Sequence, residues 1–238
     1  MHKVLRGGIR LNTNYLENNH LILVGKVTTD KVFSHETYGE SFYIFSVEIP
    51  RLSDISDIIP ITVSERLLTN LDLTVGDDIV IEGQFRSYNS YDNGRSKLML
   101  TVFAKEIRIK DDISEDDEKL NVSNEVTLIG YLCKPTIYRQ TPFGREIADI
   151  LLAVNRAYNK SDYIPCIAWG RNARFCEQLT VGTAVKVVGR VQSRNYEKKL
   201  EDGTVISKVA YEVSIGSMEV VKEDGEDATE PVAEDEAV

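Results

Sequence analysis

The sequence predicts an all-β fold built from two tandem copies of one five-stranded barrel, each with a single short helix. Three observations lead to this prediction. The 238 residues are enough for two domains of ordinary size. The second half of the chain repeats the first at a nearly constant spacing. Each copy also reads as a series of short β-rich segments separated by turn residues, with one helical stretch.

The repeat consists of glycine, proline and apolar positions kept in register. At an offset of 105 residues, the apolar runs Leu21–Val24 and Val126–Ile129 align. At the same offset, and then with one residue of slippage, further pairs match: Gly25 with Gly130, Gly39 with Gly144, Asp57–Pro60 with Asp162–Pro165, Leu73–Gly76 with Leu179–Gly182, and Gly83 with Gly189. Such a register indicates an internal duplication.

Both copies follow one order of elements. In the second copy we expect strands at Val126–Tyr131, Ile147–Arg156 and Ile164–Trp169, a helix at Arg171–Leu179, then strands at Ala184–Ser193 and Val205–Val213. In the first copy we expect strands at Leu21–Val27, Phe42–Ile49 and Ile58–Val63, a helix at Glu65–Leu71, then strands at Asp78–Phe85 and Leu98–Ile107. This is the order of the oligonucleotide-binding (OB) fold, a five-stranded Greek-key barrel.

Composition divides the chain into five segments. We expect an N-terminal extension at 1–19, a first OB fold at 20–109, an acidic linker at 110–120, a second OB fold at 121–221 and an acidic disordered tail at 222–238. The net charge of −10 is uneven. The tail carries −7 and the linker −4, whereas residues 121–221 carry +3 and residues 1–109 carry −2. The overall charge therefore does not exclude a nucleic-acid ligand.

The third strand of the second copy carries the strongest binding signal. Its side chains alternate, so Ile164, Cys166 and Ala168 share a face that is typical of a core. The opposite face holds two aromatics, Tyr163 and Trp169, together with Pro165 and Ile167. Polar residues are expected on the solvent face of a barrel strand, so aromatics there favour a platform for stacking bases.

Further aromatic and basic residues are expected around this face. Tyr158 and Tyr196 follow the second and fourth strands, beside loops, and basic residues are interleaved with them: Arg156, Lys160, Arg171, Arg174, Arg190, Arg194, Lys198 and Lys199. A basic groove of this kind binds phosphates. Structural alternatives stay open, since Trp169 could belong to the core or an interface, Tyr163 could pack against a subunit, and the lysine pair could be a solvated turn.

Three stretches of the second copy resemble those of bacterial and phage single-stranded DNA-binding proteins. They are Leu152–Arg156, Cys166–Arg171 and Val188–Glu197, and the resemblance covers about residues 122–221. It implies that Trp169 is the main stacking residue, that Tyr158, Tyr163 and Tyr196 occupy aromatic positions, and that Arg171 is a basic neighbour. It also implies a homodimer that presents four OB folds, because two-barrel members assemble in this way.

The first copy and the tail depart from that pattern. With the one-residue slip, Val63 or Thr62 stands in place of Trp169, and Ile58 in place of Tyr163, although Arg86, Tyr88 and Tyr91 are kept. The first copy is therefore interpreted as degenerate, either a weaker DNA site or a dimerisation partner. The tail lacks the aromatic tip through which the family's tails recruit replication and repair proteins, so its partner is left open.

The leading hypothesis is single-stranded DNA binding without sequence specificity, in DNA replication, recombination and repair. The alternative is a diverged primosome-type OB assembly protein that acts mainly through protein partners, and RNA or oligosaccharide ligands also fit the fold. No catalytic residues, metal ligands or cofactor are expected, because no nucleophile–base pair, metal spacing or phosphate-binding loop is found. The three cysteines and the lack of an apolar leader favour a cytoplasmic, nucleoid-associated protein without a membrane segment.

Overall fold

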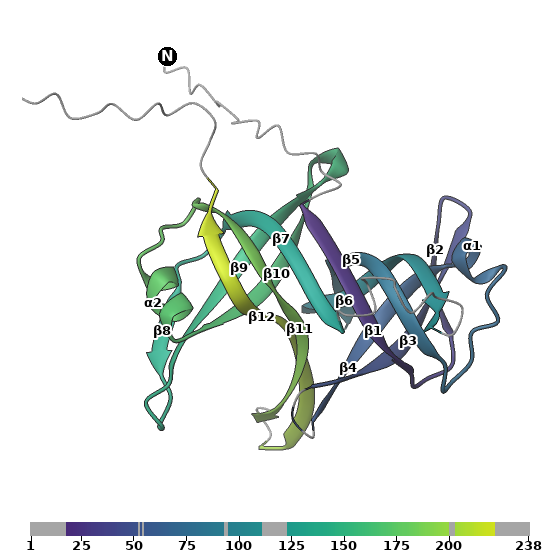
Figure 1. Cartoon of the computed structure of the whole chain (residues 1–238), viewed down its shortest axis with the longest axis horizontal. Helices are drawn as coiled ribbons and strands as arrows, with labels where there is room; N and C mark the ends of the chain where they lie inside the picture. Colours follow the sequence, from purple (N-terminus) through teal and green to yellow (C-terminus); the bar gives the residue numbers. More distant parts are fainter. Residues whose placement is uncertain are drawn as a thin grey trace, which may run out of the picture.

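The computed structural model describes residues 18–51, 53, 55–92, 95–110, 123–199 and 203–221. The expectations for the acidic tail, for the linker after Lys110 and for nearly all of the N-terminal extension lie outside these residues. Among the described residues, twelve strands form one continuous sheet that closes into two barrels, which lie side by side in Figure 1. The predicted all-β fold with two tandem OB barrels is confirmed.

The first barrel closes through five strands. They are β1 (Asn19–Val27), β3 (Glu40–Pro50), β4 (Ser56–Ser64), β5 (Asp78–Asp92) and β6 (Arg95–Ile109). Their order around the barrel is β1-β3-β4-β6-β5 and back to β1, with β4 and β6 parallel and the other pairs antiparallel. Helix α1 (Glu65–Leu68) connects β4 to β5, and Ser64 caps it by accepting a hydrogen bond from the backbone N–H of Arg66.

The second barrel repeats this topology. Its strands are β7 (Asn124–Leu132), β9 (Glu146–Arg156), β10 (Lys160–Trp169), β11 (Ala184–Lys199) and β12 (Val205–Val220), with helix α2 (Arg171–Glu177) between β10 and β11. They follow the corresponding order β7-β9-β10-β12-β11-β7. Alternating apolar residues from these strands fill each barrel with a core of fully buried side chains.

Two pairs of glycines explain why the duplicated register is kept. At Gly25 and Gly130 an added Cβ would lie 2.5 Å from the Glu48 carbonyl oxygen and 2.7 Å from the Ala153 carbonyl oxygen, respectively. These are the points where β1 approaches β3 and β7 approaches β9 to close each barrel. The second pair, Gly83 and Gly189, lies at the β-bulges of β5 and β11, where a Cβ would collide with the backbone of the partner strand.

The structure differs from the sequence-based expectation in three places. Two short strands were not expected: β2 (Val32–Thr37) and β8 (Ile137–Gln140). Strand β2 pairs with β3 and β8 with β9, each at an edge of the sheet. Neither strand has a buried side chain, so neither shows an alternating apolar pattern. The hairpins β5–β6 and β11–β12 extend further than predicted, because their ends pair with each other away from the core. Both helices end earlier, and α2 is followed by a turn at Gln178.

Strands β1 and β7 join the two barrels. They pair antiparallel from Asn19 opposite Leu128 to Leu23 opposite Asn124. This register is symmetric, because Asn19 corresponds to Asn124 and Leu23 to Leu128 in the sequence repeat. Asn19 and Asn124 extend the symmetry, because each side chain donates to and accepts from one backbone position of its own barrel, Phe85 and Val191 respectively. The chain is therefore a pseudo-twofold pair of barrels. No helix in the described part of the chain has both the length and the apolar character needed to span a membrane.

Candidate nucleic-acid interface

Strand β10 separates core and surface residues much as its alternation predicts. Ile164, Cys166 and Ala168 are buried. On the other face, Tyr163 and Trp169 keep 46% and 41% of their surface exposed, which is enough for a ring face to meet a ligand. Ile167 differs from the expectation. It is almost fully buried although it shares the parity of Trp169.

Trp169 lies in a groove lined by four arginines. Its other lining residues are Gln192, Ser193 and Ser214, and the arginines are Arg51, Arg145, Arg190 and Arg194. Arg145 comes from the turn before β9, and Arg190 and Arg194 come from β11. Arg51 comes from the first barrel, which the sequence analysis did not anticipate. We call this set the tryptophan groove.

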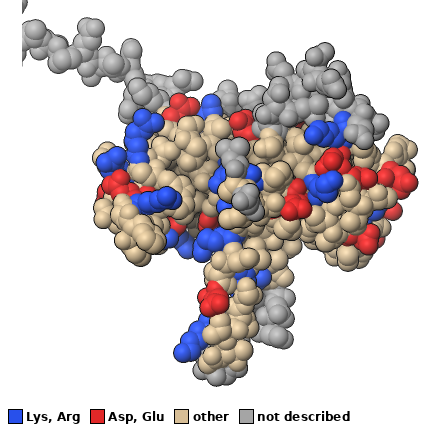
Figure 2. Space-filling view, turned by 60° about the horizontal axis from the view of Figure 1, so that its bottom comes forward, with Lys and Arg blue, Asp and Glu red and all other residues tan. Residues whose placement is uncertain are grey.

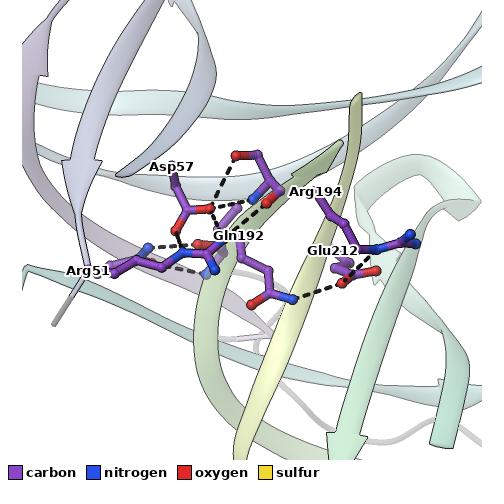
Figure 3. A network of polar contacts seen from close by, with 8 residues as sticks. Arg51, Asp57, Gln192, Arg194 and Glu212 are labelled. Atoms are coloured by element: carbon purple, nitrogen blue, oxygen red, sulfur yellow. Dashed lines mark hydrogen bonds and ion pairs between the residues drawn. The ribbon is translucent and has the colours of Figure 1, made fainter. Parts of the chain in front are cut away.

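A network of polar contacts holds part of this groove in place (Figure 3). The Arg51 guanidinium donates to Asp57 from Nε at 2.7 Å and from Nη2 at 2.5 Å, and Nη2 also donates to the Ser193 carbonyl at 3.0 Å. Asp57 in turn accepts from the backbone N–H of Ser193 at 2.6 Å. The first barrel is thereby bound to β11 of the second, and Arg51 is fixed beside the groove (Figure 3).

The charges in this network stabilise one another. Burial alone favours the neutral form of Asp57, but hydrogen bonds from Arg51 and Ser193 outweigh it and hold the pKa of Asp57 below its ordinary value. The hydrogen bond to Asp57 raises the pKa of Arg51. On the neighbouring strand, Glu212 accepts from Gln192 at 2.8 Å and lies 3.7 Å from the Arg194 guanidinium (Figure 3). Arg51 and Arg194 are therefore oriented before any ligand arrives.

The remaining predicted aromatics flank this face. Tyr158 lies in the 3₁₀ turn Ala157–Asn159, with a left-handed backbone (φ 60°) and a side chain that is 95% exposed. Tyr196 was expected in a loop but lies within β11, opposite Lys208, on the projecting part of the β11–β12 hairpin. The Arg194 guanidinium lies 6.0 Å from the centre of the Tyr196 ring, at the limit of a cation–π contact.

The predicted basic residues differ in whether an acidic side chain pairs with them and in where they lie. Arg156 forms an ion pair with buried Asp162 at 3.3 Å, and Arg174 pairs with Glu146 at 3.5 Å. Arg171 is exposed at the start of α2 and does not line the tryptophan groove. Lys198 and Lys199 are also exposed and lie at the end of β11 rather than in a loop. In Figure 2, lysine and arginine atoms gather where this projecting hairpin meets the body.

The first barrel carries a different set of residues at the equivalent face. The strand register places Ser64 opposite Phe42, as Trp169 stands opposite Ile147. Ser64 therefore occupies the place of Trp169, and the assignment to Val63 or Thr62 was wrong because the slippage in the repeat comes after this strand. Ile58, in the place of Tyr163, is 42% exposed, as the repeat implied. Phe103 lies nearby on β6 beneath the Arg86 guanidinium, 3.9 Å from the ring centre.

The sequence analysis missed Arg51 and Arg145 as members of the groove. Arg51 is brought to Trp169 only by the joint between the barrels, for which the sequence offered no signal. Arg145 follows Gly144 in the turn before β9, and a motif centred on strands does not reach it. The described residues contain no cluster of three or more potential metal ligands of the histidine, cysteine, aspartate or glutamate type.

Comparison with known proteins finds a family likeness in the second barrel. Residues 123–221 match the model of the single-strand binding protein family. The single-stranded DNA-binding protein A of Bacillus subtilis (strain 168) is 35% identical over 96 residues, covering 37% of this chain and 56% of that protein. The single-stranded DNA-binding protein 1 of Staphylococcus aureus (strain COL) is 40% identical over 83 residues, covering 32% and 50%. The chain thus spans about half the length of the curated relatives it matches.

A solved structure extends the likeness of fold to both barrels. The wild-type single-stranded DNA binding protein from Thermus aquaticus superposes with a TM-score of 0.69 at 19% sequence identity. The match covers 88% of this chain and 96% of that one. At this identity the likeness concerns the fold, and it includes the tandem arrangement of the two barrels.

Proposed function

We propose that the chain binds single-stranded DNA without sequence specificity, because its residues 123–221 match the model of the single-strand binding protein family. The family is defined by binding rather than by a reaction, and the chain is accordingly a binding protein and not an enzyme. The ligand is held by stacking of its bases on aromatic side chains and by contacts between its phosphates and arginines.

The observation that carries this proposal is the position of Trp169. A half-exposed indole among four arginines offers a base a face to stack on, and it offers the adjoining phosphates positive charge. Neither property needs a particular base, because every base has a π-face and every nucleotide carries a phosphate. A buried tryptophan or an uncharged groove would not serve this purpose.

Further parts of the proposal concern the cellular role. The protein acts in the cytoplasm, at the nucleoid, in DNA replication, recombination and repair. It works as a homodimer that presents four barrels, as the family resemblance implies. The proposal includes a contact between the acidic tail, residues 222–238, and replication or repair proteins, although this tail lacks the aromatic tip of the family's tails. Sedimentation of the full chain tests the dimer, since a monomer at binding-active concentrations would contradict that part.

The fluorescence of Trp169 gives a direct test of binding. Trp169 is the single tryptophan of the chain, so all indole emission comes from the tryptophan groove. Titration with poly(dT) at low salt is expected to quench this emission to saturation, because a stacked base changes the indole's surroundings. Duplex DNA of equal phosphate concentration is the control and should quench weakly. Emission that poly(dT) leaves unchanged, together with no binding by gel shift, would contradict the proposal.

A further inference from the structure

We propose that Phe143 stacks on a base of the bound strand at the mouth of the tryptophan groove. This inference rests on the proposed function and adds a residue that the sequence analysis did not single out. Phe143 lies in the turn between β8 and β9, and 95% of its surface is exposed. Single exposed apolar side chains are common on proteins, so the position of this ring, rather than its exposure, indicates a ligand.

The turn that carries Phe143 is held by its own hydrogen bonds. The backbone N–H of Thr141 donates to the Arg145 carbonyl at 2.8 Å, and the backbone N–H of Arg145 donates to the Thr141 hydroxyl at 3.1 Å. Gly144, with φ at 75°, donates its N–H to the Thr141 carbonyl at 2.8 Å. Pro142 restricts the backbone further. The ring is therefore presented from a fixed turn, and a base that stacks on it orders little additional backbone.

Strand β9 places this turn next to the stacking tryptophan. The backbone N–H of Gly170, the residue after Trp169, donates to the Glu146 carbonyl at 2.9 Å. Arg145, one residue before Glu146, lines the tryptophan groove. Phe143 is two residues away from Arg145 in the same turn, a separation of at most about 7 Å along the backbone. The ring therefore lies beside the groove rather than on a distant surface.

Residues from two projecting hairpins line the tryptophan groove. Arg145 comes from the β8–β9 turn, and two of the other arginines come from β11. Figure 1 shows the β8–β9 turn and the β11–β12 hairpin both projecting below the second barrel. One hairpin carries Phe143 and the other carries Tyr196. A strand stacked on Trp169 can therefore reach a further stacking surface on the β8–β9 side, where Arg145 supplies positive charge for its phosphates.

The counterpart of this turn in the first barrel has an exposed ring but lacks the positive charge. The sequence repeat places Tyr38 in the position of Phe143 and Glu40 in that of Arg145. Tyr38 is fully exposed. Glu40 accepts a hydrogen bond from Ser64, which stands where the second barrel has its stacking tryptophan. A carboxylate at this place does not attract a phosphate, so only the turn of the second barrel combines a ring with a cation.

The experiment compares variants of the full chain for binding to fluorescein-labelled oligo(dT), by anisotropy. Phe143→Ala should weaken binding about 5- to 100-fold, the effect of losing one stacked base, and Phe143→Tyr should restore it. Phe143→Leu should bind like Phe143→Ala, because a side chain without a π-face cannot stack. The matched control Tyr38→Ala removes an equally exposed ring from the first barrel and should leave the affinity unchanged.

A tryptophan placed in the turn reports the contact directly. The chain has a single tryptophan, so in the double variant Trp169→Phe, Phe143→Trp all indole emission comes from the β8–β9 turn. The substitution at 169 keeps an aromatic face for stacking. Poly(dT) should quench the emission of this variant to saturation. The matched double variant Trp169→Phe, Tyr38→Trp should keep its emission.

Failure of this inference and failure of the proposed function give different results. The inference is overturned if poly(dT) quenches Trp169 in the unaltered chain but either leaves the turn tryptophan unchanged or binds Phe143→Ala as tightly as Tyr38→Ala. A smaller sedimentation coefficient of Phe143→Ala at unchanged affinity also overturns it, since the ring would then contact a second copy. If the unaltered chain binds no single-stranded DNA, the proposed function itself fails. Thermal unfolding of every variant is recorded, and should Phe143→Ala unfold, the turn tryptophan decides the question.

Discussion

Trp169 combines two properties that rarely coincide on a barrel strand. Its ring is half exposed at the end of β10, and its groove is lined by four arginines, two of which pair with Asp57 and Glu212. A tryptophan needed for the core would bury its ring against the apolar residues of the barrel, as Phe45 and Phe85 do in the first copy. The indole is therefore expected to contribute to ligand binding and little to folding.

Replacing Trp169 with alanine should therefore weaken poly(dT) binding by about 1–3 kcal/mol, the contribution of one stacked base. The midpoint of thermal unfolding should stay close to that of the unaltered chain. Anisotropy with labelled oligo(dT) and circular dichroism melting give the two quantities. A large drop in the melting temperature, with unchanged affinity per folded molecule, would show that Trp169 supports the core.

The arginines of the tryptophan groove should differ from arginines outside it. Arg190→Ala removes a lining charge and should reduce the slope of log K against log salt by about 0.7, the value for one phosphate contact with a single strand. Arg171→Ala, an exposed residue outside the groove, is the matched control and should change the slope less. Equal effects of the two substitutions would mean that the groove does not position the phosphates.

Single residues show what the sequence could and could not predict. Strand alternation correctly placed Ile164, Cys166 and Ala168 in the core, because a period of two needs only local backbone geometry. The same rule was wrong for Ile167, which is almost fully buried on the opposite face. Arg51 could not be assigned to the site at all, because its proximity to Trp169 depends on the joint between the barrels.

At the scale of elements, the sequence predicted the strands that contact a core and missed those that do not. The barrel strands were found because their buried faces impose an apolar alternation, whereas β2 and β8 bury nothing and leave no such pattern. The far part of the β11–β12 hairpin, from Arg194 to Lys199, is likewise exposed and lies away from the core. Its polar composition suggested a loop. Paired strands that project into solvent are held by backbone hydrogen bonds, which the sequence does not reveal.

The contact between Asp57 and β11 is the element-scale feature most open to test. Asp57→Asn removes the charge that pairs with Arg51 inside a buried contact, and it should lower the free energy of unfolding at neutral pH by about 1–3 kcal/mol. Asp78→Asn, which disrupts the exposed pair with Lys26, is the control and should cost less than about 1 kcal/mol. Urea unfolding of both variants measures these changes.

The effect of Asp57→Asn should also depend on pH. Because the pKa of Asp57 lies below its ordinary value of 3.8, its contribution to stability is complete above that value. The contribution disappears as the pH falls through the lowered pKa, since the carboxylate is then protonated in the folded protein. The difference in unfolding free energy between the variant and the unaltered chain should therefore narrow in strong acid. A difference that grows in acid would contradict this assignment.

At the scale of the whole molecule, the duplication creates two related but unequal grooves. The tryptophan groove gathers four arginines around one indole, and a second groove at the joint between the barrels combines Tyr88 and Tyr163 with Arg86, Lys105 and Arg156. The sequence repeat predicted two barrels but not the pairing of β1 with β7, which sets their relative position. An interface between two copies depends on surfaces that each copy exposes alone, so a repeat cannot reveal it.

The tail should act on binding through its charge. Removing residues 222–238 takes away a net charge of −7, and affinity for oligo(dT) should be equal or higher afterwards because the tail no longer competes with DNA for basic grooves. The gain should be largest at low salt, where screening is weakest. Anisotropy titrations of both forms at several salt concentrations measure it. A marked loss of affinity would assign the tail a structural part in the site.

Photochemical cross-linking tests most directly the claim that single-stranded DNA lies on the aromatic and basic face of the second barrel. The full chain is irradiated with an oligonucleotide that carries 5-iodouracil, and the linked peptides are identified by mass spectrometry. Cross-links are expected at Trp169 and Tyr163, and excess unlabelled poly(dT) should suppress them whereas duplex DNA should not. Cross-links confined to surfaces away from β10, such as the exposed strand β2, would contradict it.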